Sequence, residues 1–183
     1  MAYFITIKQG NLLNEKADFI VNASNTKLIL GSGVSMSFKR KCGYELQKLM
    51  NKELILRKKL QKGDVVLTSS ANAENFKYAL HVAVMDYNDR VKGNDRNPTL
   101  EDIKKGLQNI EQLLQKFAFK EKKKIAIPLL GCGVGGLDKS EVIKLYKEFF
   151  QRTVEFDCEV VIYGYAEEDY ELLKKYLLTS HLH

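Results

Sequence analysis

Residues 17–34 read ADFIVNASNTKLILGSGV, and this stretch decides the fold class. It opens with a short apolar run, Ala17–Ala23, which is typical of a strand buried on both faces of a sheet. Polar and glycine residues follow, and a helical pattern then runs from Ser35 to Lys59, with an interruption expected at Cys42–Gly43. A buried strand that leads through a glycine-rich loop into a helix indicates an α/β protein.

Strand and helix patterns alternate along the rest of the chain. Further strands are expected at Tyr3–Lys8 (an edge strand), Asp64–Thr68, Tyr78–Met85, Ile125–Leu130 and Glu159–Tyr163. Further helices are expected after a capping-box-like start at Thr99 and Asp102, after an N-cap at Asp138, and from Glu167 to about Lys175. This alternation predicts an α/β sandwich with a mostly parallel sheet, whose ligands bind at the carboxyl ends of the strands.

The composition fits one globular domain. The chain has 183 residues, of which 45% are hydrophobic and 28% charged, and this excludes a disordered chain. We expect a single domain over residues 1–183, with a core over about 3–178 and a short C-terminal tail. No apolar run approaches the ~18 residues of a membrane span, and the N-terminus lacks the layout of a signal peptide. We therefore expect a cytoplasmic protein that does not contact a membrane.

The cysteines and histidines indicate neither a metal centre nor a disulfide framework. The three cysteines are Cys42, Cys132 and Cys158, and their wide spacing gives no metal-ligating pair. We expect the protein to hold no metal and no cofactor. Two of the three histidines, His181 and His183, belong to the C-terminal tail. The third, His81, lies in a strand pattern and is interpreted as a packed structural residue. Cys132 lacks a neighbouring histidine to activate it, so it is interpreted as a small loop residue rather than a nucleophile.

Two glycine-rich loops each follow a strand that is expected to be buried. The first is Gly31-Ser32-Gly33-Val34, and the second is Gly131-Cys132-Gly133-Val134-Gly135-Gly136. Glycine lets backbone N–H groups approach a ligand closely, and a helix N-terminus favours phosphate. Neither loop matches the P-loop or the dinucleotide-binding fingerprint, so neither triphosphate hydrolysis nor dinucleotide redox chemistry is indicated. The pair predicts a ligand with two adjacent phosphates; the alternative is two tight turns without a ligand.

These motifs resemble the macrodomain family. Ile20–Asn25 with Gly31–Val34 is similar to the family's IVNAAN…GGGV signature, and Lys77–His81 is similar to its KYVIH strand. Ile127–Gly135 resembles its second loop, and the resemblance extends from about Ile7 to Leu178. It implies a three-layer α/β/α sandwich with a mixed, mostly parallel central sheet. It also implies binding of ADP-ribose and, in some members, hydrolysis of ADP-ribose derivatives.

The resemblance implies a set of ligand-binding residues. Asn11, followed by Leu12, stands where the family has an aspartate that accepts the adenine amino group, and Tyr165 matches an aromatic that packs against adenine. Asn25 matches the asparagine that faces the distal ribose, and positioning that ribose is its expected catalytic role. The diphosphate is expected between the two loops and the residues beside them: Ala23, Gly31, Ser32, Gly33, Val34, Leu130, Gly131, Cys132, Gly133, Val134 and Gly135.

The chain departs from the family at the positions that carry catalysis. Hydrolytic members of one branch have an aspartate directly after GGGV, where this chain has Ser35. Another branch uses a lysine at the end of the KYVIH-like strand and an aspartate in the second loop; those neighbourhoods here hold Val84-Met85 and Val134-Gly135. Two functions therefore stay open. One is slow hydrolysis of ester-linked ADP-ribose on protein, O-acetyl-ADP-ribose or ADP-ribose 1″-phosphate, and the other is a reader of ADP-ribose without turnover.

A basic segment supports a third possibility, binding of nucleic acid. The net charge is +6, and residues Lys39–Lys62 hold nine basic residues against Glu45 and Glu53, a local charge of +7. Such a segment is either an interface for an anionic partner or a solvated helix face. Aromatic residues occur only near its start, at Phe38 and Tyr44, so a stacking platform for bases is not indicated.

Overall fold

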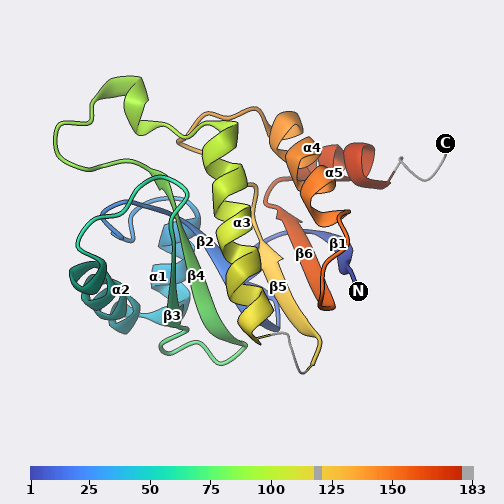
Figure 1. The fold of residues 1–183 in the computed structure, drawn as a ribbon, viewed down its shortest axis with the longest axis horizontal. Helices are drawn as coiled ribbons and strands as arrows, with labels where there is room; N and C mark the ends of the chain where they lie inside the picture. Colours follow the sequence, from blue (N-terminus) through green and yellow to red (C-terminus); the bar gives the residue numbers. More distant parts are fainter. Residues whose placement is uncertain (118–120, 179–183) are drawn as a thin grey trace.

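A computed structural model describes residues 1–117 and 121–178, and its centre is a six-stranded sheet (Figure 1). The strands lie in the order β1-β6-β5-β2-β4-β3, and every neighbouring pair is parallel except β3 with β4. Their bounds are β1 Tyr3–Gln9, β2 Ala17–Asn25, β3 Val65–Ser69, β4 Phe76–Met85, β5 Lys123–Ile127 and β6 Cys158–Gly164. The prediction of a mixed, mostly parallel sheet with β1 at its edge is confirmed.

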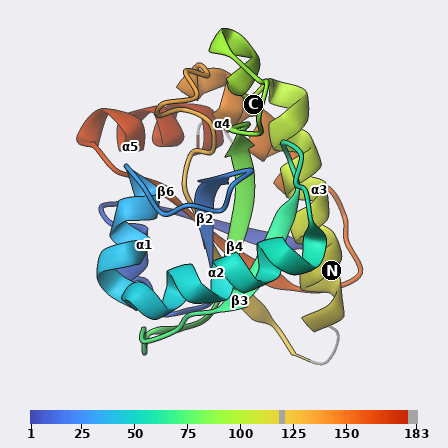
Figure 2. The ribbon, with the colours of Figure 1, turned by 90° about the vertical axis from the view of Figure 1, so that its left-hand side faces the viewer.

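Helices cover both faces of the sheet, which makes three layers. They are α1 Val34–Cys42, α2 Tyr44–Arg57, α3 Leu100–Phe117, α4 Lys139–Phe150 and α5 Glu167–Leu173, with a π-helical turn, Lys174–Leu178, after α5. Short 3-10 turns occur at Leu12–Asn14 and Gly93–Arg96. Figure 2 shows α1 and α2 on one side of the sheet and α3 on the other.

Two hydrophobic clusters fill the two interfaces between sheet and helices. Along β2, Phe19 and Val21 pack toward α3 and α4, whereas Ile20 packs toward α1 and α2. Successive side chains of a strand point to opposite faces, so an unbroken apolar run serves both clusters at once. The reading of Ala17–Ala23 as a doubly covered strand is therefore confirmed.

Local signals placed several helix boundaries correctly. The helical pattern breaks at Gly43, whose φ of +79° lies in the left-handed region that favours glycine. The Thr99 N–H donates to Asp102 Oδ2 over 2.8 Å, and the Asp102 N–H donates back to Thr99 Oγ1 over 3.2 Å. Asp138 Oδ1 accepts from the Glu141 N–H over 3.2 Å. These contacts confirm the three expected helix starts or breaks.

One strand was placed wrongly. The strand expected at Ile125–Leu130 is β5, which runs from Lys123 to Ile127. Pro128 has no N–H group for a strand ladder, and the chain leaves the sheet there. The tail residues His181 and His183 lie outside the described residues. Among the described helices, none is both long and apolar enough to cross a bilayer.

Candidate functional site

Two adjoining pockets lie where the chain leaves the carboxyl ends of β2, β4, β5 and β6. The smaller has a volume of about 390 Å³ and the larger about 540 Å³. They share one wall, made of Gly33, Val34, Leu129 and Gly133. Both glycine-rich loops contribute to this wall, so the structure brings together the two motifs that the sequence singled out.

The first loop supplies free backbone donors. Helix α1 begins at Val34, directly after Gly33, whose φ of +59° and ψ of −131° suit glycine. The N–H groups of Gly33, Val34 and Ser35 have no hydrogen-bond partner within the described residues, and all three residues line the smaller pocket. Unpaired N–H groups at a helix N-terminus, together with the helix dipole, form a site suited to an anion.

The second loop is a tight turn rather than the direct start of a helix. Leu137 and Asp138 separate Gly136 from α4, and the Leu137 N–H donates to the Gly131 carbonyl over 2.9 Å. The N–H groups of Gly133, Val134 and Gly135 are among those of this loop that have no partner in the described chain. A Cβ atom on Gly135 would lie 2.7 Å from the Gly131 oxygen, so this turn admits only glycine at that position.

The larger pocket holds the charged side chains of the site. Tyr165, 79% exposed, lies at its edge directly after β6, and Asn11 lies at the end of β1. Asn11 Oδ1 accepts from the Leu13 N–H over 3.0 Å and so caps a 3-10 turn. Lys139 Nζ lies 2.6 Å from Asp169 Oδ1 on the pocket wall, and this ion pair raises the pKa of Lys139.

Three charged residues of this pocket were missed by sequence reasoning. Arg40 comes from α1, Lys139 from the start of α4 and Asp169 from α5. No local pattern connects them: Arg40 is exposed, Lys139 is half-buried and Asp169 is buried, and each belongs to a different helix. Only the approach of α4 to α5 brings the lysine and the aspartate together.

The smaller pocket is uncharged. Among its described lining residues there is no Asp, Glu, Lys, Arg or His. Its polar groups are backbone N–H groups and the side chains of Ser24, Asn25, Ser32, Ser35 and Tyr87. This composition offers hydrogen bonds to a ligand but no side chain that acts as a general acid or base at neutral pH.

Asn25 uses its side chain mainly to shape the first loop. Its Oδ1 accepts from the Lys27 and Ile29 N–H groups over 3.0 and 3.2 Å, and its Nδ2 donates to the Ile29 carbonyl over 3.0 Å. An asparagine amide has two hydrogens, so one remains for a ligand. Asn25 therefore lines the smaller pocket with one free donor and a fixed orientation.

The comparisons with known proteins agree with this geometry. The model of the Macro domain family matches residues 21–146 of the chain. The chain belongs to the macrodomain family. An uncharacterized protein of Aquifex aeolicus is 28% identical to this chain, and the alignment covers 94% of this chain and 97% of that protein. An uncharacterized protein of Pyrococcus abyssi is 27% identical, and the alignment covers 96% of this chain and 98% of that protein.

Solved macrodomains share its fold. A mutant macrodomain of Oceanobacillus iheyensis with ADP-ribose superposes with a TM-score of 0.78 at 22% identity, over 98% of this chain and 94% of that one. The Trypanosoma brucei macrodomain in complex with ADP superposes with a TM-score of 0.74 at 20% identity, over 94% of this chain and 68% of that one. The macrodomain of Mycobacterium tuberculosis DarG superposes with a TM-score of 0.72 at 24% identity, over 89% of this chain and 99% of that one. At these identities the similarity shows the fold.

A buried chain of polar groups supports the first loop of this macrodomain. The Ser35 hydroxyl donates to Asn22 Oδ1 over 3.1 Å, and Asn22 Nδ2 lies 2.9 Å from His81 Nδ1. His81 Nε2 lies 2.9 Å from Thr68 Oγ1. Burial lowers the pKa of His81 to about 3, so the ring is neutral and accepts from Asn22. The interpretation of His81 as a structural residue is confirmed.

Two predicted site residues differ in their relation to the pockets: Cys132 lines the larger pocket, and Leu130 lines neither. Burial raises the pKa of Cys132 to about 12, so its thiol stays protonated, in agreement with a loop residue that is no nucleophile. The Leu130 side chain is fully buried in the core, and the residue lines neither pocket. Its N–H donates to the Tyr146 hydroxyl over 2.9 Å. Leu130 was included in the expected site through the resemblance of Ile127–Gly135 to the family's second loop.

The basic segment of the macrodomain is spread over α1, α2 and the loop that follows. Eight of its nine basic side chains are exposed, and Arg40 lines the larger pocket. The ninth, Lys62, is half-buried and bonded to the chain itself. This distribution agrees with a solvated helix surface that meets the ligand site at Arg40.

Proposed function

We propose that this chain binds ADP-ribose. The supporting observation is the set of six unpartnered N–H groups, at 33–35 and 133–135, beside the wall that both pockets share. A diphosphate at this wall accepts hydrogen bonds from these N–H groups on both sides, and the dipole of α1 stabilises its negative charge. The adenosine then occupies one pocket and the distal ribose the other, as expected for a ligand with a sugar on either side of a diphosphate.

The adenosine half fits the larger pocket. Tyr165 offers an exposed ring for stacking, and Asn11 retains a second lone pair on Oδ1 to accept from the adenine amino group. The distal ribose fits the smaller pocket beside Asn25. Structurally similar macrodomains of Oceanobacillus iheyensis and Trypanosoma brucei bind ADP-ribose or ADP, which supports a ligand of this class.

Calorimetric titration tests the assignment. ADP-ribose is expected to bind at one site with micromolar affinity, more tightly than AMP, which lacks the second phosphate and the distal ribose. ATP is the control for phosphate number, because it has the diphosphate without the second sugar. Equal affinity for AMP and ADP-ribose contradicts the use of both pockets.

We further propose slow hydrolysis of reactive ADP-ribose esters, with a pure reader as the alternative. A positioned acid or base contributes typically ~10²–10⁴-fold, and the smaller pocket offers none among its described residues. What remains is positioning of the ribose by Asn25 and of a water by a ligand phosphate oxygen. Acyl esters are reactive enough for this; stable glycosidic bonds to arginine are not.

Mass spectrometry of ester-linked mono-ADP-ribosylated protein measures this turnover. The wild type is expected to release ADP-ribose slowly, and Asn25→Ala to abolish release because both loop geometry and the ribose contact are lost. Full activity of Asn25→Ala contradicts the mechanism. Binding without release from any ester makes the protein a reader.

A further inference from the structure

Three exposed side chains with large apolar surfaces, two aliphatic and one the ring of a tyrosine, line the smaller pocket. They are Ile29, 55% exposed, Tyr87, 40% exposed, and Val134, 70% exposed, and all three line it. They come from three segments: the loop after β2, the segment after β4 and the second glycine-rich loop. Exposed apolar residues that converge on one pocket mark a contact surface for a ligand. We call these three residues the apolar rim.

The rim belongs to a pocket whose described lining has no charged side chain. The described lining of the smaller pocket contains no ionisable acid, lysine, arginine or histidine, whereas the larger pocket has Arg40, Lys139 and Asp169. Lys27, in the loop after β2, is paired with Asp89 at 3.7 Å. A charged group at this rim therefore loses water against apolar side chains and finds no neutralising side-chain partner in the pocket.

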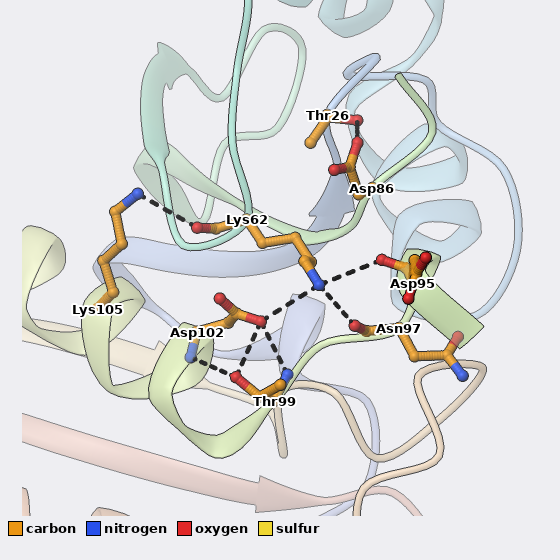
Figure 3. Close-up of polar contacts among 8 residues, drawn as sticks. All are labelled: Thr26, Lys62, Asp86, Asp95, Asn97, Thr99, Asp102 and Lys105. Atoms are coloured by element: carbon orange, nitrogen blue, oxygen red, sulfur yellow. Dashed lines mark hydrogen bonds and ion pairs between the residues drawn. The ribbon is translucent and has the colours of Figure 1, made fainter. Parts of the chain in front are cut away.

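Tyr87 is held in place through its backbone. Its N–H donates to Thr26 Oγ1 over 2.8 Å. Figure 3 shows the next contact, in which the Thr26 hydroxyl donates to Asp86 Oδ1 over 3.2 Å. Asn88 Nδ2 donates to the Leu60 carbonyl over 2.8 Å. These contacts connect the start of the segment after β4 to the loop after β2 and to the residues before β3.

Lys62 holds the other end of the same segment. Its Nζ donates to the Asn97 carbonyl over 2.8 Å and to the Asp95 carbonyl over 3.3 Å, and lies 3.5 Å from Asp102 Oδ2 (Figure 3). Asp102 belongs to the capping box of α3, so the segment is connected to a rigid helix. With both ends fixed, the Tyr87 side of the rim is preorganised, which lowers the entropy cost of contact with a ligand.

We propose that the apolar rim selects ADP-ribose derivatives with an uncharged, apolar substituent on the distal ribose. This rests on the proposed function, which places that ribose in the smaller pocket, and it narrows the substrates to acyl or aryl derivatives. ADP-ribose 1″-phosphate is disfavoured, because its second anionic group meets the rim instead of a cation. Ile29, Tyr87 and Val134 are then specificity-determining residues.

Three ligands test the proposal by calorimetry: ADP-ribose, its 1″-O-benzyl glycoside and ADP-ribose 1″-phosphate. The benzyl derivative is expected to bind several-fold more tightly than ADP-ribose, and the phosphate roughly tenfold more weakly. If ADP-ribose 1″-phosphate binds as tightly as ADP-ribose or more tightly, the proposed selectivity of the rim is wrong and the proposed function stands. Failure of ADP-ribose itself to bind overturns the proposed function.

Variants of the rim separate its role from general charge effects. Tyr87→Ala is expected to remove most of the gain from the benzyl group, and Val134→Lys to restore binding of the phosphate by supplying a cation. Ile55→Lys is the matched control, because Ile55 is 77% exposed on α2 and lines neither pocket. If Ile55→Lys improves phosphate binding as much as Val134→Lys does, long-range charge and not the rim decides selectivity.

Discussion

Replacing Tyr165 by alanine tests the adenosine half of the site. The Tyr165 side chain is 79% exposed at the edge of the larger pocket, so its ring faces are open to a base. Covering one face removes on the order of 60 Å² of apolar surface, worth about 1.5 kcal/mol at 25 cal/mol per Å². Base stacking on an aromatic is worth ~1–3 kcal/mol by alanine substitution, which agrees. We therefore expect ADP-ribose affinity to fall about tenfold.

The assay is calorimetric titration of ADP-ribose against Tyr165→Ala, Tyr165→Phe and Tyr44→Ala. Phenylalanine retains the ring and is expected to retain affinity within a few-fold. Tyr44 is the matched control, since it is 67% exposed at the start of α2 and lines neither pocket. Unchanged affinity in Tyr165→Ala refutes stacking at this position, and an equal loss in Tyr44→Ala refutes the assignment of the loss to the pocket.

Three further substitutions test other contacts. Asn11→Asp is expected to tighten adenine-containing ligands by ~1 kcal/mol, because a carboxylate keeps the cap on Leu13 and accepts more strongly; parallel titrations decide it, and weaker binding contradicts it. Cys132→Ser is expected to leave binding and ester turnover unchanged, as measured by calorimetry and mass spectrometry, because burial raises the pKa of Cys132 to about 12 and the thiol is therefore protonated at neutral pH. For His81, the pKa is lowered from 6.5 to about 3 on folding, so the unfolded chain binds the proton first and stability falls as pH drops below about 6.5. Urea unfolding at pH 7 and pH 5 is expected to show a loss of about 2 kcal/mol from this residue, which His81→Gln abolishes.

Local sequence patterns were sufficient for the layers of the fold. The alternation of Phe19, Ile20 and Val21 between two cores, and the break at Gly43, follow from side-chain period and from backbone sterics. The glycine loops were equally visible, because the residues that free their N–H groups are neighbours in sequence. The end of β5 was predicted too far along the chain because the apolar run continues to Leu130, although the strand ends at Ile127, directly before Pro128.

The division of the site into a charged and an uncharged pocket was not predictable from local patterns. Lys139 and Asp169 belong to different helices and meet only through packing of α4 near α5. The apolar rim likewise joins Ile29, Tyr87 and Val134 across more than a hundred positions of the chain. Pairing that depends on where helices and loops pack in space leaves no periodic trace in the sequence.

A crystal structure of the complex with ADP-ribose tests the central claim most directly. The account predicts the diphosphate within hydrogen-bond distance of the N–H groups at 33–35 and 133–135, adenine against Tyr165 and the distal ribose beside Asn25. Density for the ligand elsewhere, or a diphosphate that leaves both sets of N–H groups without a partner, would contradict it.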